Sequence, residues 1–167
     1  MNQFEDQIAD YLAQHMSAAS NVQVDELARI YGGSSQETYR FRALWQEQGG
    51  PVERRLILRR DAAAGLVVAE RDLEFNVYRA LVGQGLPIPK VYFMELDHKW
   101  LERPFFIMDL CAGRAGNPFS PTDPYDGHGP DIARQFWTIL GRLAAIDHRV
   151  VGLEGLRGGT ATGGYWS

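Results

Sequence analysis

Four short segments follow one another in a fixed order between Ile30 and Arg114, and this order constrains the fold more than any single motif does. A Gly/Ser-rich turn lies between two strand-like runs, and a further strand then ends on Arg59. The helical segment that follows carries Glu74, and an apolar strand at 105–108 runs into a glycine-containing linker. No single segment is specific, but their order predicts a lobe in which a helix packs against a sheet.

Apolar periodicity predicts both helices and strands. Phe4, Ile8 and Leu12 fall on one helical face and predict an amphipathic helix over residues 2–16. Tyr39, Phe41, Ala43 and Trp45 alternate with other residues and predict a strand over 38–45. Turn chemistry follows at 48–51. Further strands are predicted at 27–31, 55–60, 91–95 and 105–110, and further helices at 67–82 and 131–148.

The residue composition of the chain changes after Leu110. Residues 112–130 contain four glycines and four prolines without a hydrophobic period, which indicates a connector or lid. The helix predicted after them carries an inward face of Ile132, Phe136, Ile139, Leu140, Leu143 and Ile146. We therefore divide the chain into residues 1–110, a mixed α+β lobe with an N-terminal helix, and residues 111–167, a linker and the beginning of a helical lobe.

Composition excludes several classes of function. The net charge of −4 argues against nucleic acid as the main partner, because binding a phosphate backbone needs a basic surface. Cys111 is the only cysteine, so neither an intrachain disulfide nor a thiolate metal site is expected. No signal peptide and no membrane-spanning run is evident in the sequence, so we expect a soluble cytoplasmic protein without a membrane partner.

The Gly/Ser turn is a candidate phosphate site. Backbone N–H groups can approach an anion where side chains are small, and Gly33, Ser34, Ser35 and Gln36 provide such a turn between two strands. It is not a P-loop, because no Gly-Lys-Ser/Thr follows and the next element is a strand. Taken alone, such a turn is more often a plain hairpin loop.

Arg59 and Glu74 form a candidate pair beside this turn. Side chains alternate along a strand, so Ile57 and Arg59 share one face, where Ile57 could lie against an adenine while Arg59 reaches phosphates. Arg60 faces the other way and serves as a control residue. A solvated strand end is the plain alternative for Arg59. Glu74 is of interest only as the partner of Arg59, and Asp72 and Glu70 compete with it for that role.

The strand that ends at Met108 leads into a possible base-binding linker. Backbone groups of Asp109 and Cys111 could hydrogen-bond the edge of an adenine there. We do not expect Cys111 to act as a nucleophile, since no histidine with an orienting carboxylate is evident. The histidines are scattered without ligand spacing, so no zinc site is predicted.

These motifs resemble the aminoglycoside phosphotransferase and choline kinase-like superfamily, which has the protein-kinase fold. The likeness extends over about residues 27–147 and is greatest to the kinase-like domains associated with acyl-CoA dehydrogenases. The Gly-x-Ser-Asn-x-Thr-Tyr turn of that branch is similar to residues 33–39, with Gln36 in place of asparagine. Its linker and strand motifs are similar to residues 86–91 and 104–109. Residues 140–147 resemble its Leu-Ala-x-Leu-His helix, with Ala144 where the family has histidine.

The resemblance implies a kinase-like N-terminal lobe, a five-stranded antiparallel sheet plus helix, followed by part of a helical lobe. It implies ATP as phosphate donor, Mg²⁺, and a small hydroxyl-bearing substrate. The His-Gly-Asp loop and the magnesium-binding aspartate of the family are not found in the chain, so we assign no catalytic residue and no metal ligand. We expect the 167 residues alone to be inactive. The alternatives are a non-catalytic nucleotide-binding or interaction module and a pseudokinase. The apolar face of the last helix also predicts a homodimer.

Overall fold

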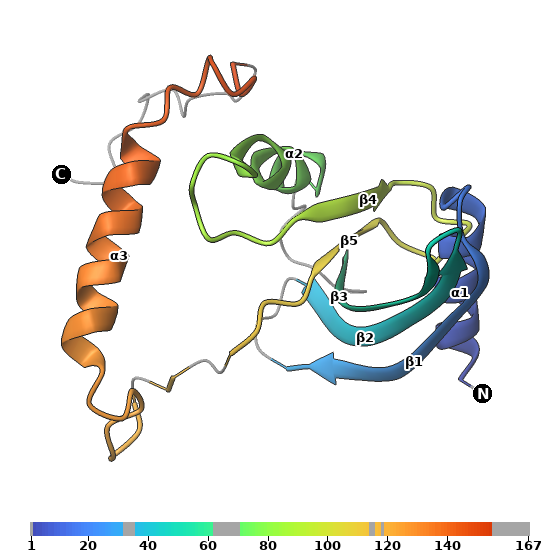
Figure 1. Ribbon diagram of the computed structural model, residues 1–167, viewed down its shortest axis with the longest axis horizontal. Coiled ribbons are helices and arrows are strands. Elements are labelled where there is room, and N and C mark those ends of the chain that lie inside the picture. Colours follow the sequence, from blue (N-terminus) through green and yellow to red (C-terminus); the bar gives the residue numbers. More distant parts are fainter. Residues whose placement is uncertain (1, 32–35, 62–70, 114–115, 118, 155–167) are drawn as a thin grey trace, which may run out of the picture.

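The fold is a five-stranded antiparallel sheet with helices on both of its faces and a third helix beyond a linker (Figure 1). The computed structural model describes residues 2–31, 36–61, 71–113, 116–117 and 119–154. The strand order is β1-β2-β3-β5-β4. The elements are α1 (Gln3–His15), β1 (Ser20–Ile30), β2 (Gln36–Glu47), β3 (Gly50–Asp61), α2 (Arg71–Leu81), β4 (Val91–Glu95), β5 (Phe105–Asp109) and α3 (Gly129–Ala144). The predicted fold class is confirmed.

Helix α1 forms where the sequence pattern predicts it, and β2 and β3 form a hairpin whose connection falls within the predicted turn region. The Asn2 side chain caps α1 by accepting a hydrogen bond from the N–H of Phe4 at 3.2 Å, which satisfies one of the unpaired donors of the first turn. Strands β2 and β3 meet at a tight turn in which Gly50 has a φ of +111°, a conformation that side chains rarely adopt. The two strands pair without a break from Gln36 with Asp61 to Glu47 with Gly50.

Several predicted boundaries were wrong. Strand β2 covers Gln36–Glu47 rather than residues 38–45, and β3 begins at Gly50, inside the turn predicted at 48–51, rather than at residue 55. Strand β1 begins at Ser20 rather than at residue 27. Its register with β2 shifts in two places, once between residues 20 and 23 and once between residues 25 and 28. These shifts interrupt the alternation of side chains by which a strand is recognised in a sequence, so the first part of β1 was missed. Strand β5 ends one residue early, at Asp109. Helix α3 ends at Ala144 rather than at residue 148, since the Asp147 side chain accepts from the N–H of Arg149 at 2.9 Å and begins a turn.

The main core lies between α1 and one face of the sheet. Ile8, Tyr11 and Leu12 of α1 are almost completely buried there. The sheet contributes every second residue of its central strands, as the predicted alternation requires. These buried sheet residues are Phe41, Ala43, Trp45, Leu56, Leu58, Phe105 and Ile107.

The opposite face of the sheet carries a smaller core under α2, the green helix in Figure 1. Phe75 of α2 packs against Phe106 and Val91, with Tyr78 and Met108 partly buried beside them. The rings of Phe75 and Phe106 meet edge-on at 6.1 Å. Among the described residues, the apolar cluster beneath α2 is smaller than the one beneath α1.

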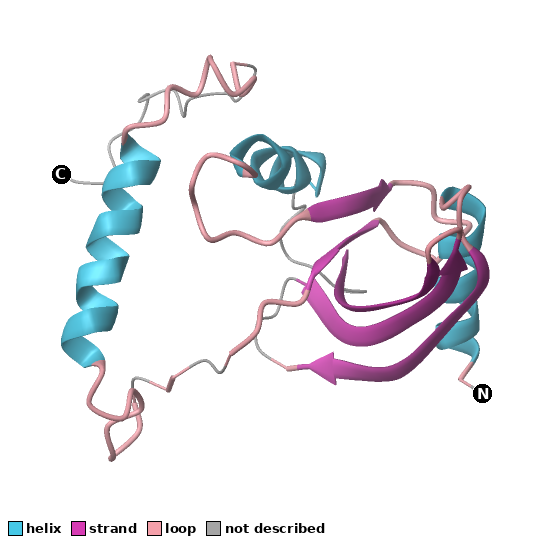
Figure 2. Ribbon diagram, viewed as in Figure 1, coloured by secondary structure: helices cyan, strands magenta, loops and turns pink. Residues whose placement is uncertain are grey.

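Helix α3 follows the linker and stands apart from the sheet (Figure 2). It contains no buried residue among those described, although an inward face was predicted. The side chains of that face are open to solvent, with Phe136 57% and Leu140 41% exposed. Trp137 beside them is 67% exposed. Among the described helices, none is long and apolar enough to cross a membrane. The division at residue 110 stays a prediction.

Candidate functional site

Strand β3 places two adjacent arginines on opposite faces of the sheet. The Arg59 guanidinium lies over the ring of Phe106, at 5.6 Å from its centroid, on the side that α2 covers. The Arg60 guanidinium lies over the ring of Phe4, at 4.6 Å, on the side of α1. The predicted opposite orientation of the two arginines is confirmed, and only Arg59 faces the region where a nucleotide was expected.

Arg59, Glu74 and Gln36 form a closed hydrogen-bonded triad. One terminal nitrogen of Arg59 donates to Glu74 Oε1, and the other donates to Gln36 Oε1. Gln36 Nε2 in turn donates to Glu74 Oε2 at 3.2 Å. The triad therefore ties together β2, β3 and α2, with the Arg59 and Glu74 side chains 22% and 25% exposed. The predicted pairing of Arg59 with Glu74 is confirmed. Of the competing carboxylates, Asp72 is exposed and Glu70 lies outside the described residues.

Gln36, the last residue of the predicted Gly/Ser turn, belongs to this triad. Gly33, Ser34 and Ser35 lie outside the described residues, so their predicted contact with phosphate stays a prediction. Gln36 is the first residue of β2 and lies in register with Asp61 of β3. Sequence reasoning placed Gln36 in a phosphate-holding turn and did not foresee that its amide bridges the ion pair. Its neighbour Glu37, on the other face, binds Arg60.

Ile57 and Met108 lie beside the triad on adjacent strands. Ile57 shares the face of Arg59, is 5% exposed and pairs in register with Met108 of β5. Met108 packs partly buried against the small core under α2. This places an apolar surface next to a cationic group on one face of the sheet, as the sequence predicted. Contact of Ile57 or Met108 with a base stays a prediction.

The first residues of the predicted linker continue the sheet. Fewer of their backbone groups are therefore available to bind a base. The backbone N–H of Asp109 donates to the Lys90 carbonyl at 2.9 Å, and that of Leu110 donates to the Arg55 carbonyl at 3.1 Å. The Asp109 carboxylate accepts from the Tyr92 hydroxyl at 2.7 Å. The N–H of Asp109 is thus engaged by the sheet and does not serve as a donor to an adenine. Base binding by the Asp109 carbonyl and by the backbone of the exposed Cys111 stays a prediction.

Arg60, the control residue, belongs to a buried ion-pair cluster. It donates to Glu37 Oε2 from Nη2 at 2.6 Å and from Nε at 3.1 Å, and to the Leu101 carbonyl from Nη1 at 3.2 Å. Arg103 approaches the same carboxylate at 3.5 Å. Burial alone would raise the pKa of Glu37. Arg60 opposes this effect through its hydrogen bond and its charge, and the charge of Arg103 and the hydroxyl of Tyr39 act in the same direction. Together they outweigh burial, so the pKa of Glu37 is lowered.

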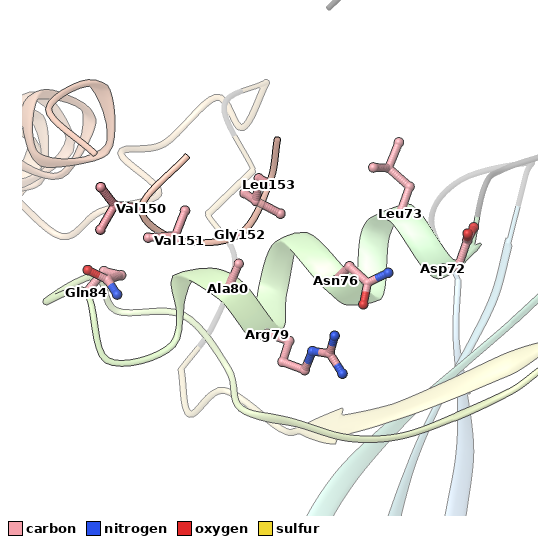
Figure 3. A pocket seen from close by; sticks show the side chains of 10 residues that line it. All are labelled: Asp72, Leu73, Asn76, Arg79, Ala80, Gln84, Val150, Val151, Gly152 and Leu153. Atoms are coloured by element: carbon pink, nitrogen blue, oxygen red, sulfur yellow. The ribbon is translucent and has the colours of Figure 1, made fainter. Parts of the chain in front are cut away.

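A hollow of about 730 Å³ lies away from the triad, between α2 and the turn after α3 (Figure 3). Its lining includes Asp72, Asn76 and Arg79 of α2 and, from the turn after α3, Val150 and Leu153. No residue predicted for nucleotide binding lines this hollow. Within the ranges that the structure describes, no group of three His, Cys, Asp or Glu side chains could hold a metal ion.

The comparisons with known proteins identify the family. Residues 26–163 match the model of the phosphotransferase enzyme family, so the chain belongs to that family. It is 29% identical over 90 residues to acyl-CoA dehydrogenase family member 10 of Mus musculus. The aligned residues make up 53% of this chain and 8% of the mouse protein. The resemblance found in the sequence is confirmed.

A solved structure supports the fold. A crystal structure from Ralstonia eutropha, of a protein assigned as an aminoglycoside phosphotransferase, superposes with a TM-score of 0.59 over 89% of this chain. The sequence identity is 18%, so this likeness shows the kinase-like N-terminal lobe and no more. The chain spans 40% of that protein, less than half of its length.

The Glu37 cluster yields a prediction about pH. Because the pKa of Glu37 is lowered in the folded chain, its ion pair stabilises the fold above the ordinary glutamate pKa and is lost as the pH falls through the lowered value. We expect Glu37→Gln to reduce the free energy of unfolding by about 3 kcal/mol at pH 7. The reduction should be smaller at pH 3, as measured by urea unfolding. An equal reduction at both pH values would contradict the assignment, and Glu102→Gln, at an exposed position, is the control.

Proposed function

We propose that this chain is the ATP-binding part of a small-molecule phosphotransferase that transfers the γ-phosphate to a substrate hydroxyl. Membership of the phosphotransferase family supports the reaction class. The observation that carries the proposal is the triad of Gln36, Arg59 and Glu74, which holds one cation beside the buried Ile57.

The triad suits a phosphate ligand because of the donors that Arg59 retains. A guanidinium has five N–H donors, so bonds to Glu74 and Gln36 leave further donors for phosphate oxygens. Glu74 fixes the direction of the guanidinium, which is the role of the helix glutamate that pairs with the strand lysine in protein kinases. An adenine would lie on Ile57 and Met108, with Asp109 and Cys111 at its edge. Gly33, Ser34 and Ser35 would meet the phosphates.

The remaining parts of the reaction are not assigned to this chain. Phosphoryl transfer needs a group that orients the acceptor hydroxyl and magnesium ions that neutralise charge on the phosphates. We assign neither the base nor a magnesium ligand to any of the 167 residues. We therefore propose that the chain binds ATP and is inactive by itself. A non-catalytic module would differ in that the longer protein would also fail to transfer phosphate to any hydroxyl.

Substitution of Arg59 tests the proposed site. We expect Arg59→Ala to weaken ATP binding at least tenfold, because a charged hydrogen bond contributes about 1.5–3 kcal/mol and 1.4 kcal/mol corresponds to a factor of ten. Isothermal titration calorimetry with ATP measures this change. Arg59→Lys should restore most of the affinity, since kinases place lysine at this position.

A loss of folding could imitate a loss of binding, so thermal unfolding of each variant without nucleotide is the first control. Unchanged ATP affinity in a folded Arg59→Ala variant would show that Arg59 does not hold the nucleotide. Equal losses in Arg59→Ala and Arg59→Lys would point to packing rather than charge.

We also propose that the 167-residue chain associates with itself through α3. Contiguous exposed apolar side chains drive association, and Phe136 and Leu140 lie on one face of this helix. Light scattering over a concentration series should give a dimer or a larger species. The variant Phe136→Asp with Leu140→Asp should give a monomer, whereas Gln135→Asp, at an exposed polar position of the same helix, should not change the mass. A wild-type monomer at high concentration would contradict the proposal.

A further inference from the structure

A β-bulge in β4 places two consecutive aromatic side chains on the same face of the sheet. Two steps along β4, from Val91 to Phe93, correspond to one step along β5, so Tyr92 is the extra residue of the bulge. Side chains normally alternate between the two faces of a strand, yet Tyr92 and Phe93 both pack against the core on the α1 side. Bulges often lie next to functional sites, where they change the direction of one side chain.

The bulge directs the Tyr92 hydroxyl to the residue at which β5 meets the linker. This hydroxyl donates to Asp109 Oδ1 at 2.7 Å and accepts a hydrogen bond from Arg54 Nη1. Burial and the Asp109 carboxylate raise the pKa of Tyr92, against an opposite effect of Arg54, so the hydroxyl keeps its proton at neutral pH. Arg54, Tyr92 and Asp109 belong to β3, β4 and β5, and we call this connection the Tyr92 bridge.

Further contacts hold both ends of the Tyr92 bridge in place. The Arg54 guanidinium lies 5.1 Å from the centroid of the Tyr92 ring and 5.9 Å from that of the Trp45 ring. Lys90 Nζ lies 5.1 Å from the centroid of the Tyr92 ring, and the carbonyl of Lys90 accepts from the N–H of Asp109 at 2.9 Å. Asp109 is therefore fixed through its side chain and through its backbone by the same part of β4.

The Tyr92 bridge lies on the face of the sheet opposite the proposed adenine site. Side chains alternate along β5, so Asp109 shares the α1 side with Ile107, whereas Met108 belongs to the core under α2. The Asp109 carboxylate is thus held behind the sheet, away from the face that carries Ile57 and Met108. Residues 110–113 of the linker contain no helix or strand, so the contacts of Asp109 determine where the linker begins.

We propose that Tyr92 is a positioning residue for the nucleotide base, because it fixes the linker groups that meet the edge of adenine. This role rests on the proposed function, in which the Asp109 carbonyl and the backbone of Cys111 bind that edge. Tyr92 acts from behind the sheet, through Asp109, and does not touch the base. Loss of its hydroxyl therefore weakens the binding of the base and leaves the phosphate contacts of Arg59 in place.

The first test measures amide hydrogen exchange of the intact chain by NMR, without any ligand. Tyr92→Phe removes only the hydroxyl and should speed exchange at Asp109 and Leu110 about tenfold, while amides in the middle of β5 keep their rates. Tyr39→Phe is the matched control, because the Tyr39 hydroxyl donates to Glu37 Oε2 at 3.2 Å on the same face of the sheet. It should leave exchange at Asp109 and Leu110 unchanged.

The second test uses calorimetry with adenosine and with inorganic tripolyphosphate, which separates the base from the phosphates. Tyr92→Phe should lower the adenosine affinity about fivefold and leave the tripolyphosphate affinity unchanged, whereas Arg59→Ala should do the reverse. Asp109→Ala should lower the adenosine affinity as much as Tyr92→Phe does. The variant with both changes should lose no more than either one, since both break the same hydrogen bond.

Unchanged exchange at Asp109 and Leu110 in Tyr92→Phe, or unchanged adenosine affinity, would overturn this role of Tyr92. Equal losses of adenosine and tripolyphosphate affinity would also overturn it, because they would mean a general loss of structure, and so would additive losses in the double variant. A wild-type chain that binds neither ligand would contradict the proposed function instead. The exchange rates, which need no ligand, then decide by themselves whether Tyr92 holds the start of the linker.

Discussion

The alternation of side chains along β3 determines what each face of the sheet contains. Leu56, Leu58 and Arg60 point toward α1, whereas Ile57 and Arg59 point toward α2. Each face must therefore accommodate a guanidinium beside a buried apolar strand, and a cation in such a place is stable only when it is paired. Glu37 supplies the carboxylate on one side and Glu74 on the other.

The two ion pairs differ in how they can respond to a ligand. Arg60 and Glu37 are 11% and 12% exposed and are held by Leu101, Arg103 and two aromatic rings, so their role is to stabilise the lobe. Arg59 and Glu74 are about twice as exposed and join a helix beneath which the described residues form a small apolar core. A phosphate bound at Arg59 would therefore also act on the position of α2.

The sequence predicts the parts of this structure that depend on one residue pattern. The apolar alternation of β2 and the helical period of α1 are continuous, so both elements were found, and the pairing of Arg59 with Glu74 follows from their positions on adjacent elements. Contacts that depend on exact register were not predictable. The bond from Asp109 N–H to the Lys90 carbonyl and the bridging amide of Gln36 both appear only when the strands are aligned.

We propose that Arg59 and Glu74 act as one unit in holding ATP. A double-mutant cycle measures this directly, with ATP affinities for the wild type, Arg59→Ala, Glu74→Gln and the double variant. We predict that Glu74→Gln weakens ATP binding when Arg59 is present and has little effect when it is absent, with a coupling free energy of about 1 kcal/mol or more. Additive losses in the double variant would contradict the claim, because they would mean that Glu74 does not act through Arg59.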